Sequence, residues 1–331
     1  MPPSSESPYG SSGFESSAGA VATQPLEDPL LAGLRRPRRI LVAGASGFVG
    51  RHLVARLLAR GHDVRALARS PRPDLVPGER VEWWAGDVTR PESLRGAAGD
   101  REVVFHLVGV ARERGEETFR RVHVEGTRNL LAEARRAGAR RFILVSVTGA
   151  RGDGSPFFRS KHQAESEVVA SGLPYVIFRP SIIYGPGDQF TSALALLLRR
   201  LPVFPVLAVG SLRLQPVAVE DVADALAQAA ERSDLEGEVY ELAGPERLKF
   251  TKIVRTVSRT LDLRRPIVQF PKFLAGPALR LVGWLGLPAP LSPQQLDMFR
   301  ETSLLTRTDN VLRTVFLVEP LPFRDAVVDY L

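Results

Sequence analysis

The sequence contains no cysteine, so neither a structural disulfide nor thiolate chemistry is available to it. This absence suits a cytoplasmic setting. Histidine is also scarce: only five are present, and none of them pair at the spacing of metal ligands. We therefore expect no metal site.

A long uninterrupted apolar run is missing as well. The most apolar segment, residues 273–291, is broken by glycines and prolines and is too short to span a bilayer. Several of its apolar residues share one helical face, which predicts part of the core or a lid over a substrate pocket. The alternative is docking on a membrane surface or a protein partner. We expect a cytoplasmic protein. The alternative is peripheral association with the inner face of a membrane.

The chain has only a small excess of positively charged over negatively charged residues. The chain has 44 lysines and arginines against 37 aspartates and glutamates, a formal net charge of +7. The arginines are scattered and no nucleic-acid-reading motif appears, so no nucleic-acid partner is expected. With 331 residues, of which 44% are hydrophobic, the chain is long enough for one large or two modest domains with a core.

Residues 1–36 are rich in serine, glycine and proline and show almost no periodicity. This composition predicts a disordered tail. The tail has no apolar run of the signal-peptide type, and its acidic residues argue against a transit peptide.

A strand, a glycine turn and a helix follow the tail. Residues 40–43 form a short apolar run typical of a buried strand, and Gly44, Gly47 and Gly50 follow at three-residue spacing. The first glycine permits a sharp turn, the second lets the backbone approach a pyrophosphate, and the third lets the helix pack against the strand. The N–H groups at the start of a helix near Val49 would hold the phosphates. In this context the motif predicts dinucleotide binding; a plain glycine-rich turn is the alternative.

Strand and helix patterns then alternate. We predict strands at residues 40–43, 63–68, 81–85, 102–108, 142–147, 175–178 and 239–242, and helices at about 116–137 and 158–171. Such alternation indicates parallel strands joined by right-handed helical crossovers. The predicted fold class is α/β, a Rossmann-type doubly wound parallel sheet with a smaller, mainly helical C-terminal substrate region.

The domain limits follow from this pattern. We place the NAD(P)-binding Rossmann domain at residues 37–244, including parts of the substrate lobe from about residue 185. The mainly helical C-terminal region then covers residues 245–331.

The end of the second predicted strand bears on the choice of cofactor. A carboxylate there would hydrogen-bond the adenosine ribose and favour NAD, but Arg69 follows the strand instead. A guanidinium matches a 2′-phosphate, so NADP(H) is favoured over NAD(H); a solvent-exposed arginine is the alternative. Asp87, after the third strand, could accept a hydrogen bond from the adenine amine or could cap the next turn.

These residues resemble the extended and atypical short-chain dehydrogenase/reductase superfamily, which includes epimerase- and dehydratase-like proteins. The resemblance covers roughly residues 39–244 and is carried by segments 44–50, 86–88, 106–109, 160–161 and 179–181. Within the superfamily, segments 158–165, 204–205 and 215–217 are most similar to the branch of the NADPH-carrying accessory subunit of respiratory complex I and its bacterial relatives. The resemblance and the motifs together assign cofactor contacts to Gly44, Ser46, Gly47, Phe48, Val49, Gly50, Arg69, Asp87, Val88, Leu107, Val108, Gly109, Lys161, Pro180 and Ser181.

The resemblance also implies a catalytic set. Active members use a tyrosine four residues before a lysine to move a proton, and a serine or threonine after the fifth strand to orient a carbonyl. Lys161 is present, but Phe157 holds the tyrosine position, and phenylalanine cannot transfer a proton. The serine position falls near Val147. We expect Ser146 to point into the sheet, so Thr148 joins Lys161 as the catalytic candidate.

Two functions remain open. The first is a cofactor-holding, redox-sensing or complex-accessory protein that acts through a partner. The second is an NADP-dependent oxidoreductase or epimerase acting on a sugar nucleotide, an isoprenoid or a quinone-like substrate. Its proton donor would be water, Thr148 or Tyr184, which lies in the loop after the sixth strand and otherwise has a packing role.

Overall fold

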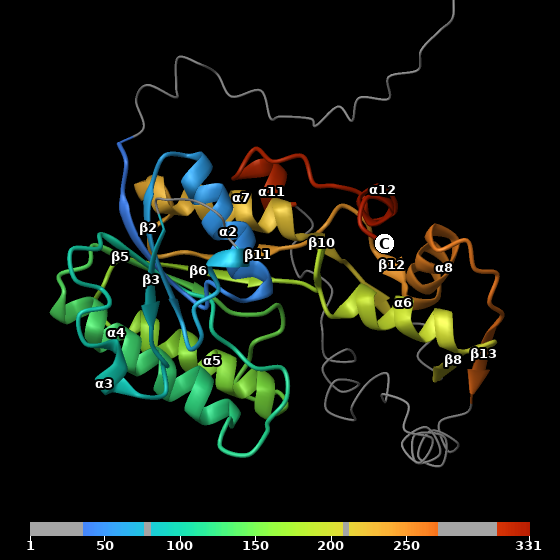
Figure 1. The fold of residues 1–331 in the computed structure, drawn as a ribbon, viewed down its shortest axis with the longest axis horizontal. Helices are drawn as coiled ribbons and strands as arrows, with labels where there is room; N and C mark the ends of the chain where they lie inside the picture. Colours follow the sequence, from blue (N-terminus) through green and yellow to red (C-terminus); the bar gives the residue numbers. More distant parts are fainter. Residues whose placement is uncertain (1–35, 76–80, 208–211, 271–309) are drawn as a thin grey trace, which may run out of the picture. The chain divides into compact units, whose positions relative to one another are not determined.

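The computed structural model of the chain describes residues 36–75, 81–207, 212–270 and 310–331. Its main feature is a seven-stranded parallel sheet with the order β11-β6-β5-β4-β1-β2-β3 (Figure 1). The strands are β1 (Arg39–Ala43), β2 (Asp63–Ala68), β3 (Val81–Ala85), β4 (Val103–His106), β5 (Arg141–Val145), β6 (Tyr175–Pro180) and β11 (Val239–Leu242). The strand order runs outward from β1 in one direction and from β4 in the other. The switch point between β1 and β4 is where open sheets of this kind bind ligands, and the predicted fold class is confirmed.

The apolar character of β1 explains its central place. Ile40 and Val42 lie in the core on one face of the sheet, and Leu41 and Ala43 lie in the core on the other. All four side chains are fully buried. A strand covered on both faces reads as a continuous apolar run, which is the pattern that predicted it.

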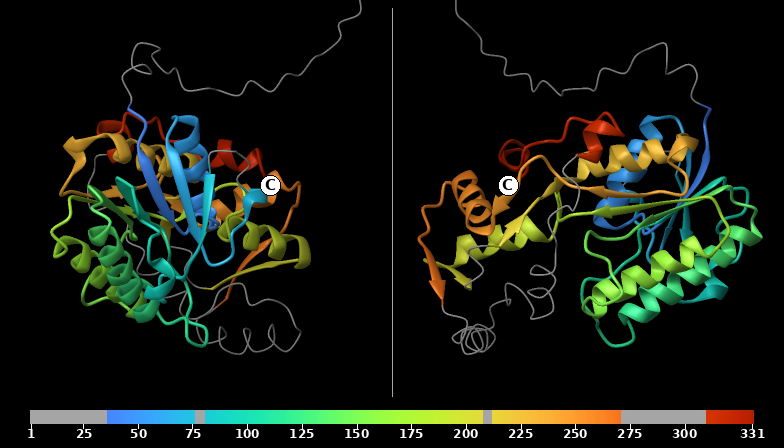
Figure 2. Two further views of the ribbon diagram at one scale, coloured as in Figure 1. Left: turned by 60° about the vertical axis from the view of Figure 1, so that its left-hand side comes forward. Right: turned by 180° about the vertical axis from the view of Figure 1, so that it is seen from behind.

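Helices cover both faces of the sheet (Figures 1 and 2). One face carries α2 (Phe48–Ala59), α7 (Val219–Glu231) and α11 (Val311–Thr314), and the other carries α3 (Pro91–Leu94), α4 (Gly126–Arg136) and α5 (Pro156–Val169). Helices α2 and α7 pack through apolar residues such as Leu57 and Leu226, and an ion pair joins Arg56 to Asp224. These helices hold the ends of β1 and its neighbours in fixed positions.

A second core lies outside the sheet. It is built by α6 (Phe190–Arg200), α8 (Phe250–Thr260) and α12 (Phe323–Val328), together with three short strand pairs. The pairs are β7 (Ile183–Tyr184) with β10 (Val217–Ala218), β9 (Arg213–Leu214) with β12 (Leu248–Lys249), and β8 (Phe204–Leu207) with β13 (Ile267–Phe270). The prediction of mainly helical structure after residue 250 omitted strand β13, whose pairing partner lies far away in the sequence.

The helix predicted at 116–137 begins later than expected. A π-helix, η2 (Arg120–Glu125), precedes α4, and residues before Phe119 form a turn. The Glu113 carboxylate accepts a hydrogen bond from the Phe119 backbone N–H at 2.8 Å, which caps the helical segment. Strand β4 is also shorter than predicted, ending at His106.

Helix α11 and the residues after it pack on the sheet. Phe316 contacts Phe178 of β6 and Tyr240 of β11, with ring centroids 5.6 and 5.3 Å apart. Residues on both sides of the predicted domain limit at residue 244 therefore contribute to one hydrophobic core. The domain limits stay a prediction. The predicted tail at 1–36, apart from Arg36, and the apolar segment 273–291 lie outside the described residues. Within the described parts, none of the helices is long and apolar enough to cross a membrane.

Candidate functional site

The glycine turn links β1 to α2. Gly44 has a φ of +89°, and a Cβ there would lie 3.1 Å from the Val108 backbone nitrogen, so both its conformation and its close approach require glycine. A Cβ on Gly50 would lie 2.1 Å from the Gly44 carbonyl oxygen, which explains the third glycine. Gly47 is different. It has an ordinary φ of −74° and lines a pocket.

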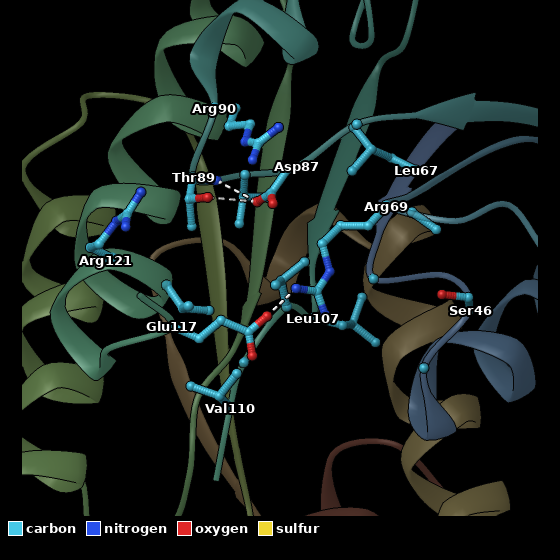
Figure 3. A pocket seen from close by; sticks show the side chains of 18 of the residues that line it. Ser46, Leu67, Arg69, Asp87, Thr89, Arg90, Leu107, Val110, Glu117 and Arg121 are labelled. Atoms are coloured by element: carbon cyan, nitrogen blue, oxygen red, sulfur yellow. Dashed lines mark hydrogen bonds and ion pairs between the residues drawn. The ribbon is translucent and has the colours of Figure 1, made fainter. Parts of the chain in front are cut away.

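The pocket has a volume of about 350 Å³ and opens at the carboxyl ends of β1 to β4 (Figure 3). Of the predicted cofactor residues, those that line it are Gly44, Ser46, Gly47, Arg69, Asp87, Val88, Leu107, Val108 and Gly109. Those outside its lining are Phe48, Val49, Gly50, Lys161, Pro180 and Ser181. The pocket lies at the start of α2, whose first N–H groups lack partners within the helix and favour an anion.

Asp87 has a structural role as well as a place in the pocket. Its Oδ1 accepts hydrogen bonds from the Thr89 backbone N–H and hydroxyl, both at 2.9 Å. This is the turn-capping role given above as one of two alternatives. The same side chain lines the pocket, as Figure 3 shows.

Charged side chains surround the outer part of the pocket. Arg69, Arg90 and Arg121 contribute guanidinium groups, and Glu116 and Glu117 contribute carboxylates. Arg69 forms an ion pair with Glu117, and Arg121 Nη1 lies 2.8 Å from Glu116 Oε2. The pair with Arg121 lowers the pKa of the Glu116 carboxyl, and Arg90 contributes in the same direction. The sequence pointed to Arg69 alone among these five.

Lys161 of α5 is buried beside the pocket. Its Nζ donates to the Val145 carbonyl oxygen at 3.3 Å and lies 3.2 Å from the position a Cβ would take on Gly109. Burial lowers the pKa of the Lys161 ammonium to about 8, partly offset by the nearby Glu165 carboxylate. A buried lysine that still carries a proton at neutral pH is costly to the fold.

Replacing Lys161 with methionine is therefore expected to stabilise the cofactor-free protein at pH 7, by roughly 1–3 kcal/mol. The folded-state pKa of this lysine lies below its unfolded value of 10.5. Between about pH 8 and 10.5 the unfolded chain therefore binds the proton that the folded chain has lost, and the stability of the wild type rises with pH. The advantage of the variant should shrink over that window. Chemical denaturation of both proteins across pH 7–10.5 measures this; equal stability at pH 7 would contradict it.

Phe157 packs in an apolar cluster that we call the phenylalanine cluster: Phe119, Phe157 and Phe158, with Val110 and Val147 against them. The rings of Phe119 and Phe157 lie 5.5 Å apart at 73°, and Phe157 is 7% exposed. The positions at which the resemblance expects a tyrosine and a serine, Phe157 and Val147, thus belong to one water-poor cluster.

The two hydroxyls beside Val147 differ. Thr148 is fully buried, and its Oγ1 donates to the Arg179 carbonyl oxygen at 2.8 Å. Ser146 is also buried, but its Oγ has no hydrogen-bond partner among the described residues. The catalytic assignment of Thr148 stays a prediction, and its hydroxyl is already engaged with the backbone.

His123 is a site residue that the sequence analysis missed. Its Nε2 accepts a hydrogen bond from the Val110 backbone N–H at 3.1 Å, so the ring proton is on Nδ1, which donates to Ser160 Oγ at 2.8 Å. Ser160 in turn donates to the Phe157 carbonyl oxygen at 2.7 Å. Burial, and then the charge of Lys161, lower the pKa of His123 to about 2. The histidine is neutral and fixes the loop after β4 to helix α5.

His123 is also held by its neighbours. Its ring stacks on Phe119 at 5.6 Å and 18°, and meets the edge of Phe157 at 5.6 Å and 80°. It lies in the π-helix η2, a local geometry often found at functional sites. A sequence signal for this role was absent, because neither the π-helix nor the partner on α5 can be seen in one segment.

Tyr184 has the packing role. It is fully buried, its hydroxyl donates to the Leu321 carbonyl oxygen at 3.1 Å, and its ring meets Phe323 at 4.9 Å. Burial raises the pKa of its phenol. It does not line the pocket.

Comparison with known proteins places this architecture in a family. Residues 44–233 match a family model described as NAD(P)H-binding. A ceramide reductase of Caulobacter vibrioides is 35% identical over 298 residues, covering 88% of this chain and 91% of that protein. The mitochondrial NADH dehydrogenase [ubiquinone] 1 alpha subcomplex subunit 9 of Arabidopsis thaliana is 30% identical over 292 residues, covering 82% and 71%.

Solved structures share the fold. The crystal structure of gox2253 superimposes with a TM-score of 0.69 and 28% identity, covering 88% of this chain and 96% of that one. The Bordetella bronchiseptica enzyme WbmH, solved in complex with NAD⁺, has a TM-score of 0.68 and 17% identity, covering 88% and 97%. From the sheet order, the glycine turn and these matches, the chain is an NAD(P)-binding protein of the extended and atypical short-chain dehydrogenase/reductase superfamily.

Proposed function

We propose that this chain binds NADP(H) and works mainly as a cofactor-holding protein, in a redox-sensing or complex-accessory role. The observation that carries this proposal is the phenylalanine cluster. Phe157 and Val147 stand where active relatives place the proton-transferring tyrosine and the carbonyl-orienting serine, and both are packed among apolar side chains. Lys161 remains beside Gly109, so the binding half of the site is kept while the usual proton donor is absent.

The preference for NADP(H) rests on Arg69. It follows β2, lines the pocket and is 65% exposed, so its guanidinium can turn toward a ligand. Residues 69–70 after β2 offer no carboxylate to a ribose hydroxyl. Arg90 and Arg121 are further guanidinium groups in the pocket lining, where the carboxylates of Glu116 and Glu117 offset their charge.

Replacing Arg69 with alanine is expected to weaken NADPH binding by about 1–3 kcal/mol, the usual range for a charge-assisted contact, while NADH binding changes little. Titration of both cofactors by calorimetry measures the difference. Equal losses for NADPH and NADH would contradict the assignment of Arg69 to the 2′-phosphate.

The holding role is tested on the wild-type protein loaded with NADPH. We expect the absorbance of the reduced nicotinamide to persist when ketones of long-chain lipids, quinones or sugar nucleotides are added. A steady loss of that absorbance with stoichiometric formation of a reduced product would overturn the holding role and support an enzyme.

The second candidate is a reductase of a long-chain lipid carbonyl. The similarity to the Caulobacter ceramide reductase over 91% of that protein favours it. NADPH, when bound, would supply a hydride to the carbonyl carbon. The oxygen would take its proton from water or from the Lys161 ammonium, whose pKa of about 8 suits proton release near neutral pH. The similarity to the NADH dehydrogenase subunit of Arabidopsis thaliana is the basis for the proposed partner. By this proposal, the chain is an accessory subunit of a protein complex.

A further inference from the structure

An ion pair crosses the pocket from one wall to the other. Arg69 follows β2, and Glu117 precedes η2 on the opposite wall, and Figure 3 shows their charged ends meeting between the walls. Both residues line the pocket. Their interaction therefore lies in the space that a ligand has to enter.

The backbone that carries Glu117 is held in place. The Arg114 N–H donates to the Glu117 carbonyl oxygen at 3.2 Å, and the Glu117 N–H donates back at 2.9 Å. Two residues further on, the Phe119 N–H is bound by the Glu113 carboxylate. Glu117 is therefore fixed at its backbone, and a rotation of its side chain is enough to release Arg69.

A phosphate and a carboxylate compete for one guanidinium. A phosphate monoester carries about −1.5 to −2 charges at pH 7 and binds arginine through two parallel hydrogen bonds. Glu117 occupies Nη1 of Arg69, so a phosphate that binds the edge of the guanidinium carrying Nη1 has to displace the Glu117 carboxylate, and the charge of the phosphate repels that carboxylate. A ribose with a free 2′-hydroxyl meets neither obstacle.

We propose that Glu117 is a specificity-determining residue of this pocket: its carboxylate competes with the 2′-phosphate for Arg69 and so limits the preference for NADP(H) over NAD(H). The inference rests on the proposed binding of NADP(H) through Arg69. Removal of the Glu117 charge frees the guanidinium and strengthens NADPH binding more than NADH binding.

Glu116 provides a matched control. It is the neighbouring residue, also lines the pocket and carries the same charge, but it pairs with Arg121 and is 87% exposed. Glu116→Gln and Glu117→Gln change the net charge of the pocket equally. Any general electrostatic effect on a phosphorylated ligand appears in both variants. Because Glu116→Gln releases Arg121 and Glu117→Gln releases Arg69, the part of the difference that disappears in the Arg69→Ala background isolates the pair with Arg69.

The experiment measures dissociation constants of NADPH and NADH for the wild type, both glutamine variants, Arg69→Ala and Arg69→Ala combined with each glutamine change, at one ionic strength. We expect Glu117→Gln to raise the NADPH preference about two- to five-fold beyond Glu116→Gln, the range of an exposed ion pair. In the Arg69→Ala background this surplus should vanish.

Equal effects of Glu116→Gln and Glu117→Gln would overturn the inference, since only the general charge would then matter. A fall in NADPH affinity in Glu117→Gln would also overturn it, because Glu117 would then be a cofactor ligand. These results differ from those expected if the proposed NADP(H) preference itself is wrong. In that case Arg69→Ala would weaken the binding of NADPH and of NADH equally.

Discussion

Replacing Phe157 with tyrosine is expected to raise NADPH-dependent reduction of carbonyl or quinone substrates by about 10²–10⁴-fold, the usual contribution of a positioned acid–base group. The new hydroxyl would stand four residues before Lys161 on the same helix, α5. The ammonium would lower the pKa of the phenol and make it a better proton donor and acceptor. Initial rates with saturating NADPH, measured on the panel used for the wild type, give the comparison.

The double variant Phe157→Tyr/Lys161→Met is the control for this gain. If the tyrosine acts through the lysine, the double variant should lose most of the added rate while keeping the phenol. A wild-type protein that already turns over at ordinary enzyme rates, with no change in Phe157→Tyr, would mean that the site has another proton donor. The holding role would then be wrong, and Lys161, Ser146 and Thr148 would be the residues to replace next.

Replacing Gly47 with valine is expected to abolish cofactor binding, with a loss of at least about 100-fold, because overlap with a rigid diphosphate costs roughly 3 kcal/mol or more. The fold should survive. Gly47 has a φ of −74°, which valine adopts without strain, and the nearest atom to an added Cβ is the Gly44 carbonyl oxygen at 3.1 Å. The two methyl groups would occupy the pocket at the start of α2.

Gly99→Val is the matched control for this variant. A Cβ on Gly99 would also meet one carbonyl oxygen, that of Gly96, at 3.1 Å, and Gly99 does not line the pocket. Both variants should therefore show similar thermal unfolding, while only Gly47→Val loses NADPH in calorimetry. Undiminished binding in a folded Gly47→Val protein would mean that the glycine serves the turn alone.

The central strands of the sheet could be predicted from sequence because burial on both faces leaves a clear apolar run. Strand β1 is the simplest case, with Ile40 to Ala43 fully buried. The helix start could not be placed, since Glu116 and Glu117, which follow Gly115, have a composition compatible with the first turn of a helix. The contact that ends the turn there joins the Glu113 side chain to the Phe119 N–H, and it depends on three-dimensional geometry.

The candidate site also has features that the sequence predicts and features that it does not. Residues close together in one segment, such as Gly44 and Gly47, could be predicted from spacing to lie at the pocket, which they line. The partnership of Arg69 with Glu117 joins segments 48 residues apart, and that of His123 with Ser160 joins segments 37 residues apart. Such pairs depend on strand register and helix packing. The direction of the Thr148 side chain could not be predicted from the alternation of side chains along a strand, because β5 ends at Val145.

The packing of α11 on the sheet has a consequence for biosynthesis. Phe316 is 2% exposed and covers Phe178 and Tyr240, which belong to strands made much earlier. As the chain leaves the ribosome, the sheet can assemble once β11 has emerged, but this apolar surface stays uncovered until the segment around Phe316 follows. A chain stalled before Phe316 would thus present exposed aromatic rings to chaperones and proteases, and the core closes only after this segment has emerged.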